Sequence, residues 1–372
     1  MMIQDSGPSI RPDFLVTGTN SQRKGIAMFT SSNKLACLVF GLLISWGALA
    51  ADTVAVNPNH PDHYVVVKGD TLWDIAGRFL RDPWLWPDVW HVNPQIANPH
   101  LIYPGDIITM TYVNGQPRLS LQRGSMVHLS PQVRSTPLDG AIPAIPIDAI
   151  HQFLTRPYVM EQEELDSAPY VVAFADEHIL GSNDIKAYVR SIDTTDNRKF
   201  DVVRPGDAYK DAETGEILGY EALYISSSEL LQPGDPATLM LNDMELETVK
   251  GDRLLPVSED TPLNTFFPAA PKQDVKGSII GVLNGVSQIG QFNVVVLDRG
   301  AGDGLEAGNV LTIDHRGETI RDIVSKTRGD TVTLPDEPAG TLMVFRTFDR
   351  VSFALVMKAS RAIHVLDRVR NP

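Results

Sequence analysis

The order of local patterns between Tyr64 and Tyr112 restricts the fold of this chain more than any other feature of its sequence. Tyr64-Val-Val-Val-Lys68 is a β-branched run typical of a strand, and Ile107-Ile-Thr-Met-Thr111 is a second one. A helical pattern lies between them, and Pro87 can occupy the first position of a second short helix that runs to Asn93. The segment therefore predicts a small domain with the order strand, helix, helix, strand.

The first helix of this segment has both a start signal and an apolar face. Gly69-Asp70 is a turn signal, and Thr71 with Asp74 forms the pattern of a capping box. The apolar residues that follow recur at the spacing of one helix face, and they are Leu72, Ile75, Ala76, Phe79 and Leu80. We expect an amphipathic helix that begins directly after Thr71.

These residues resemble the LysM family. The resemblance rests on Tyr64-Val-Val-Val-Lys-Gly-Asp-Thr-Leu-Trp-Asp-Ile-Ala76, on Asn93, and on Leu101-Ile-Tyr-Pro-Gly-Asp106 before the last strand. It covers only the segment 64–112. LysM modules bind glycans that contain N-acetylglucosamine, such as those of peptidoglycan or chitin. The resemblance thus implies a carbohydrate-binding module.

The resemblance also implies where the sugar lies, in a shallow groove between the first strand–helix turn and the loop before the last strand. Carried onto this sequence, the groove residues are Gly69, Asp70, Thr71 and Leu72 on one side and Asn98, Leu101 and Ile102 on the other. An acetamido group offers an amide donor, a carbonyl acceptor and a methyl group, so the groove needs exposed backbone amides and an apolar floor. Leu72, Leu101 and Ile102 are expected to form that floor. Asp70 and Thr71 can also simply cap the helix, and both roles can coexist.

The stretch between the two helices, Arg81–Trp90, is longer and more aromatic than in an ordinary LysM module. Of the five tryptophans in the chain, four lie in or near it: Trp73, Trp84, Trp86 and Trp90. We expect Trp73 and Trp90 to fill the core of the small domain. Trp84 and Trp86 lie between two prolines in a stretch expected to be non-helical, and they are open between a core role and aromatic contact with a sugar.

Residues 1–50 have the pattern of a signal peptide. Lys34 precedes the apolar run Leu35–Leu49, which is long enough for a signal-peptide core and too short to span a bilayer. Ala48-Leu-Ala50 fits the cleavage rule, so we expect the mature chain to begin at Ala51. Residues 1–27 are polar and patternless, and Met28 is an alternative start. We therefore expect a periplasmic protein without a transmembrane or lipid anchor.

Composition excludes several other classes. Acidic residues outnumber basic ones 46 to 32, for a net charge of −14, which disfavours binding to nucleic acid or to an anionic membrane. Cys37 is the single cysteine, so a disulfide scaffold and cysteine-rich metal sites are excluded. The nine histidines form no H-x-H pair and no H-E-x-x-H motif, the spacings that zinc-dependent wall enzymes use. We expect no metal and no cofactor.

Residues 114–169 are rich in proline and lack helical periodicity, apart from a possible short helix over Asp148–Leu154. Isoleucine and leucine are too frequent here for a purely flexible linker. We expect an extended connector that packs along a neighbouring domain, with a solvated helical turn at Glu161–Glu164.

Residues 170–372 are β-rich and internally repeated, which makes the whole chain α+β. Four pairs of similar segments suggest the repeat: Phe200–Val203 with Phe292–Val295, Gly219–Ile225 with Gly340–Arg346, Ala237–Leu241 with Ala354–Lys358, and Asp252–Leu254 with Asp367–Val369. We expect two related modules, at 170–258 and 275–372, folded as small barrels or sandwiches. The aspartates Asp252 and Asp367 are expected to hold the last strand or turn of each module in place.

Two functional hypotheses remain open. The first is a non-enzymatic peptidoglycan-binding protein of the periplasm, whose β modules dock another envelope protein or pack on themselves. The second is a LysM-targeted wall hydrolase with an unrecognised active site in residues 170–372. We expect the first, because no segment of the sequence pairs a nucleophile with a base in a recognised catalytic pattern.

Overall fold

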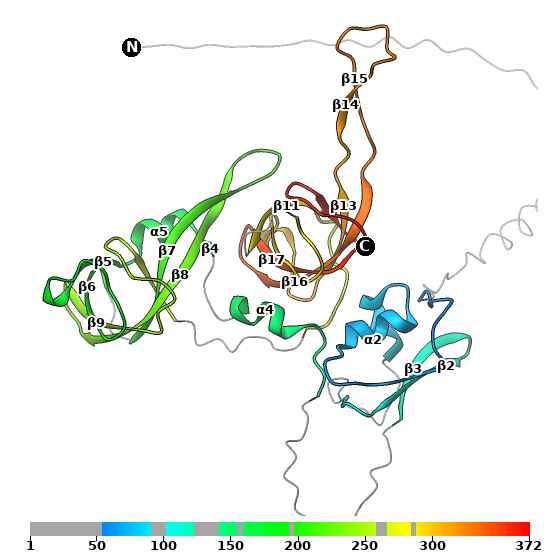
Figure 1. The fold of residues 1–372 in the computed structure, drawn as a ribbon, viewed down its shortest axis with the longest axis horizontal. Coiled ribbons are helices and arrows are strands. Elements are labelled where there is room, and N and C mark those ends of the chain that lie inside the picture. The colour runs from blue at the N-terminus through cyan, green and yellow to red at the C-terminus, as the bar shows by residue number, and fades with distance from the viewer. Residues whose placement is uncertain are drawn as a thin grey trace, which may run out of the picture. The chain divides into compact units, whose positions relative to one another are not determined.

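The computed structural model describes residues 54–90, 102–122, 141–154, 159–192, 197–257, 266–283 and 288–372 (Figure 1). The predicted signal peptide, the end of the second helix at Asn93 and the groove residues Asn98 and Leu101 lie outside these residues. No helix within the described residues is long and apolar enough to cross a membrane.

The first folded part contains three strands and two α-helices. Its elements are β1 His63–Val65, α2 Leu72–Phe79, the 3-10 helix η1 Pro83–Leu85, α3 Trp86–Trp90, β2 Ile107–Val113 and β3 Gln116–Gln122. The strands form one antiparallel sheet in the order β1-β2-β3. Strand β3 belongs to the segment expected to be an extended connector, so the sheet has one strand more than the sequence pattern predicts. The turn before it is Asn114-Gly115, where both residues have positive φ.

Helix α2 has the predicted start and the predicted buried face. Thr71 is its N-cap, and the Thr71 hydroxyl accepts a hydrogen bond from the Asp74 amide. The same hydroxyl donates to the Asp74 carboxylate, so that carboxylate reaches back to the cap side chain. The five predicted face residues, Leu72, Ile75, Ala76, Phe79 and Leu80, are all buried. They share a hydrophobic core with Ile142 and Ala144 from the connector.

The second helix predicted from Pro87 is present as α3, but the residues before it, which were expected to be non-helical, form a 3-10 helix. Pro83 starts the 3-10 helix η1, and helix α3 follows at once from Trp86. This arrangement turns Trp86 and Trp90 inward, and both are buried in the core of this part. Trp73 is buried too, whereas Trp84 is only partly buried. The expected core role is confirmed for Trp90, and Trp86 proves to be a core residue as well. Trp73 is buried outside this core, in a separate cluster with Ile145, Ile150 and Phe153, so the prediction for it is wrong.

The connector contains short elements of its own. They are α4 Ile147–Leu154, β4 Val159–Met160 and α5 Gln162–Ser167. Helix α4 confirms the short helix predicted over Asp148–Leu154, and α5 begins within the acidic run expected to form a helical turn. Strand β4 pairs with the edge of the first β module at Tyr220 and Glu221.

Six strands between residues 170 and 256 close into a ring. In chain order they are β5 Tyr170–Phe174, β6 Lys186–Arg190, β7 Lys199–Lys210, β8 Ile217–Gln232, β9 Ala237–Asn242 and β10 Arg253–Pro256, with the 3-10 helix η2 Ala175–Glu177 after β5. The pairing order is β8-β7-β10-β5-β6-β9, and β9 pairs again with β8. The first strand, β5, therefore lies beside the last, β10.

The second module is a closed barrel in the order β11-β12-β17-β16-β13-β18. Its strands are β11 Lys276–Leu283, β12 Val294–Leu297, β13 Val310–His315, β16 Glu337–Thr347, β17 Ser352–Ala359 and β18 Arg368–Arg370, and the 3-10 helix η3 Ala301–Asp303 follows β12. A separate hairpin, β14 Thr319–Arg321 with β15 Thr331–Thr333, is inserted between β13 and β16. In Figure 1 this hairpin (orange) extends away from the barrel.

The two modules share one strand order, which confirms the internal repeat. Reading both rings from their first strand matches β5 to β11, β6 to β12, β7 to β13, β8 to β16, β9 to β17 and β10 to β18. Three of the four predicted segment pairs lie on matching strands. The pair Phe200–Val203 with Phe292–Val295 is wrong, because the first lies on β7 and the second leads into β12. Short runs of phenylalanine and valine recur in many strands, so such a string does not fix the alignment.

Candidate functional site

The strand–helix turn of the predicted groove is held by its own side chains. Asp70 is buried, and its carboxylate accepts from the Val67 amide at 2.9 Å and from the Tyr64 hydroxyl at 2.9 Å. Burial raises the pKa of Tyr64, and the hydrogen bond to Asp70 raises it further. Gly69 takes φ +95°, and a β-carbon there would meet open space. Asp70 thus fixes the turn and Thr71 the start of the helix, while Gly69 provides the sharp bend that precedes both residues.

A second turn of the same kind lies on the opposite side of the groove. The Asp106 carboxylate accepts from the Tyr103 amide at 3.0 Å, as Asp70 does from Val67. Backbone hydrogen bonds then join the two turns: the Val66 amide donates to the Asp106 carbonyl, and the Gly105 amide donates to the Val66 carbonyl, both at 2.8 Å. The two sides that the sequence predicts to border the groove are therefore held side by side.

Two of the three predicted floor residues, Leu72 and Ile102, lie inside the domain, and Leu101 is outside the described residues. Leu72 is buried and Ile102 has 0% of its surface exposed. Both belong to the core that also holds Phe79 and Ile108. Their side chains are therefore core groups and form no exposed apolar floor, so only their backbone groups could bond to a ligand at the predicted groove.

Those backbone groups are bound by a segment of the connector, residues Ile142–Ala144, which we call the strap. The Leu72 amide donates to the Pro143 carbonyl at 3.0 Å, and the Trp73 amide donates to the Ala144 carbonyl at 3.1 Å. On the other side, the Ile142 amide donates to the Ile102 carbonyl at 2.9 Å. The strap thus bonds to both sides of the predicted sugar groove. The packing of this connector segment along a neighbouring domain agrees with the sequence analysis, whereas its hydrogen bonds to the groove were not predicted, because the segment has no periodic pattern and lies outside the family motif.

The two candidate aromatic contacts have different surroundings. Trp86 is buried, and its ring centroid lies 6.2 Å from that of Phe267. Its indole Nε1 has no hydrogen-bond partner among the described residues. Trp84 is partly buried and packs against the hydrophobic cluster that contains Trp73. Of the two, only Trp84 keeps a surface that a ligand could touch.

The predicted turn aspartates of the β modules make matching contacts. The Asp252 carboxylate accepts from the Val249 amide at 2.8 Å and pairs with Arg204 of β7 at 2.8 Å. The Asp367 carboxylate accepts from the His364 amide at 2.8 Å and lies 2.9 Å from His315 Nδ1 at the end of β13. Each aspartate ties its last turn to the matching strand of its module, as expected.

Among the described residues, His315, His364 and Asp367 form a group whose potential metal-ligand atoms lie within 4.8 Å of one another. Both carboxylate oxygens of Asp367 already accept hydrogen bonds, because Oδ1 also accepts from the Arg316 amide. Asp252 holds the same position in the first module, where Arg204 takes the place of His315. The geometry is that of a turn clamp that the two modules share.

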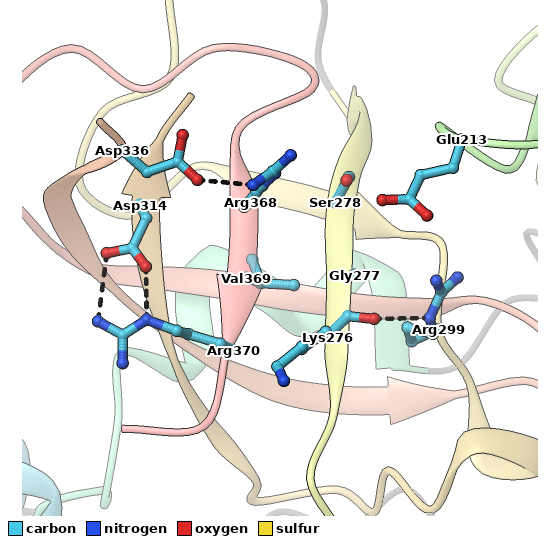
Figure 2. Close-up of a pocket in the computed structure, with 10 residues that line it drawn as sticks. All are labelled: Glu213, Lys276, Gly277, Ser278, Arg299, Asp314, Asp336, Arg368, Val369 and Arg370. Carbon is cyan, nitrogen blue, oxygen red and sulfur yellow. Dashed lines mark hydrogen bonds and ion pairs between the residues drawn. The ribbon is translucent and has the colours of Figure 1, made fainter. Parts of the chain in front are cut away.

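Figure 2 shows a pocket of about 480 Å³ at the edge of the barrel. Two of its arginines pair with its aspartates, Arg370 with Asp314 and Arg368 with Asp336. Arg299 donates to the Lys276 carbonyl at 2.8 Å and pairs with Asp211 at 3.0 Å. Ser278 also lines the pocket, but no histidine or cysteine is among its lining residues. The pocket is a polar surface depression whose side chains do not pair a nucleophile with a base.

Comparison with known proteins identifies the first folded part. Residues 64–111 match the family model of the LysM domain. The uncharacterized protein YqbP of Bacillus subtilis (strain 168) is 44% identical over 55 residues, which are 12% of this chain and 25% of YqbP. The chain thus spans about a quarter of the length of this curated relative, and the similarity is confined to a part of each protein.

Proposed function

We propose, from the LysM domain that residues 64–111 form, that this protein binds the glycan strands of peptidoglycan and does so without enzymatic activity. A LysM domain implies binding of peptidoglycan-type or chitin-type glycans. The observation that carries the proposal is the match to this family, over a segment in which the turns at Asp70 and Asp106 lie side by side. The backbone groups of Leu72, Trp73 and Ile102 bond from these two sides to one segment, the strap. Recognition of an acetamido group requires the same arrangement of backbone donors and acceptors.

Co-sedimentation of the purified protein with peptidoglycan tests the binding. Chitotetraose should compete, whereas cellotetraose, which has the same chain length but no acetamido groups, should not. Equal competition by both sugars, or by neither, would contradict recognition through the acetamido group.

The absence of catalysis is part of the proposal. It is supported by the barrel pocket, where two of the three arginines pair with Asp314 and Asp336. The buried aspartates Asp252 and Asp367, which hold turns, support it as well. A zymogram on purified cell walls should show no clearing. Clearing by residues 170–372 would favour the alternative, a LysM-targeted hydrolase.

We also propose that the protein acts in the periplasm after cleavage behind Ala50. LysM domains are typical of envelope-associated proteins, and the sequence around Ala48-Leu-Ala50 supports the cleavage site. N-terminal sequencing of the exported protein should begin at Ala51. A chain that begins at Met1 or Met28 would contradict this proposal.

The β modules are proposed to dock another envelope protein, and the β14–β15 hairpin is the surface that favours this. At its tip, Ile323 is 88% exposed and Val324 is 86% exposed. An isolated two-stranded hairpin is marginally stable in water, so a partner that covers the apolar tip would stabilise it.

A further inference from the structure

The strap occupies the hydrogen-bonding groups that the proposed ligand needs. The first amides of a helix have no partner within the helix, and in α2 the amides of Leu72 and Trp73 are satisfied by the strap carbonyls of Pro143 and Ala144. The Ile102 carbonyl, across the groove, is satisfied by the Ile142 amide. Three backbone groups that border the predicted groove are therefore already bonded.

The strap also matches an acetamido group chemically. It presents carbonyl acceptors, an amide donor and the methyl side chain of Ala144, which are the same three kinds of group that N-acetylglucosamine offers. Ile142 and Ala144 are buried in the LysM core, while Ala141 and Pro143 are exposed. A sugar and the strap cannot bond to the same amides and the same carbonyl at once.

The strap is held by few interactions of its own. It forms neither helix nor strand, and Pro143 at its centre has no amide hydrogen to donate. Two buried side chains and three hydrogen bonds to the groove fix it. Such a segment can leave the groove without unfolding a regular element.

We propose that the strap is an intramolecular competitor of the glycan, so that the LysM groove is closed until a glycan displaces residues 142–144. The proposal rests on the proposed glycan-binding function and adds its regulation. If the open form is a minor fraction of the molecules, the apparent dissociation constant for glycan is raised by the inverse of that fraction. Release of the strap by other means should therefore strengthen binding.

The test is isothermal titration of chitotetraose into the full-length mature protein and into Ile142→Asp, which places a charge where the strap side chain is buried. The variant should bind about tenfold tighter or more, because the closed form no longer competes. Ala141→Asp is the matched control: it adds the same charge at the exposed neighbouring residue and should bind as the parent protein does.

Hydrogen exchange gives a second readout on the unmodified protein. The Ile142 amide should be protected in the free protein and should lose that protection when chitotetraose is added, while the Leu72 and Trp73 amides stay protected because the sugar replaces the strap. If Ile142→Asp unfolds the LysM domain, as circular dichroism would show, Ile142→Ala takes its place with a smaller gain in affinity.

The outcomes separate the two proposals. Binding by the parent protein with no gain in either Ile142 variant, or unchanged protection of the Ile142 amide on binding, overturns the strap competition and leaves glycan binding in place. No binding by the parent protein or by any folded variant overturns glycan binding itself, and the strap proposal with it. Binding by the Ile142 variants alone supports both.

Discussion

The main-chain amide of Trp73 donates a hydrogen bond to the carbonyl oxygen of Ala144, at 3.1 Å. Trp73 lies within the LysM match and Ala144 lies beyond its end at residue 111. The folded unit around the groove is therefore larger than the family motif. It includes strand β3 and the strap, which contribute Leu119, Ile142 and Ala144 to its core.

The contribution of β3 to this unit can be measured by replacing Leu119 with alanine. Leu119 is buried in the LysM core, so Leu119→Ala should lower the free energy of unfolding by about 2–5 kcal/mol through lost burial and a cavity. Urea denaturation followed by tryptophan fluorescence, to which Trp86 and Trp90 of this core contribute, measures the change. Tyr112→Ala, at an exposed position of β2, is the control and should change stability little. An effect of Leu119→Ala as small as that of the control would show that β3 does not belong to the unit.

The turn clamps of the β modules predict a loss of stability without a loss of binding. Asp252→Ala or Asp367→Ala removes a buried carboxylate and leaves backbone amides without an acceptor, which should cost about 2–4 kcal/mol. Differential scanning calorimetry would show a lower melting temperature, while co-sedimentation with peptidoglycan should stay unchanged. Asp235→Ala, from the exposed ion pair with Arg190, is the control and should cost less than about 1 kcal/mol. Wall-degrading activity that is lost with either clamp aspartate would count against a structural role.

Acidification should lower the free energy of unfolding, because it protonates the Asp211 carboxylate. The amide of Thr214, with that of Glu213 and the Arg299 guanidinium, holds the pKa of Asp211 well below its ordinary value near 3.8. Because this pKa is lower in the folded chain than in the unfolded one, the stability that the carboxylate contributes is present above pH 4 and is lost as the pH falls below that value. Asp211→Asn should therefore destabilise the protein by about 1–2 kcal/mol at pH 6 and by less at pH 2.5, as measured by urea denaturation. An equal difference at both pH values would contradict this assignment.

The apolar tip of the β14–β15 hairpin should contribute to binding of a partner protein and not to the stability of the fold. Replacing both Ile323 and Val324 with serine removes exposed apolar surface, so the free energy of unfolding should change by no more than about 0.5 kcal/mol. A photo-crosslinker at residue 323 should capture an envelope protein in cells, and one at exposed Ile179 in the first module is the control position. Equal capture from both positions, or capture from neither, would remove this hairpin as the docking surface.

The sequence predicts the LysM elements well because local signals specify them. The Thr71 cap and the apolar spacing from Leu72 to Leu80 both act within one or two turns of a helix. Strand β3 escaped prediction because Pro117 weakens its strand signal, and its partner Ile107–Val113 is what stabilises it. The hydrogen bonds between the strap and the groove were not predicted for a related reason. They join backbone groups, and backbone groups leave no pattern in the residue types. The wrong alignment of Phe200 with Phe292 has a similar cause. Strands β7 and β12 hold different positions in their modules, and only the strand pairing, which the residue types do not reveal, distinguishes them.

In both β modules the first strand pairs with the last, and this decides when each module can finish folding. Strand β18 bridges β11 and β13, where Val369 lies opposite Gly277 on one side and Ile313 on the other. Hairpins within the module can form as the chain emerges, but the ring must wait for its final residues, and contacts between such distant segments form slowly. Until then β11 and β13 present unpaired edges, which invite pairing with other chains. Residues 368–370 thus govern the time that the nascent barrel spends open to aggregation.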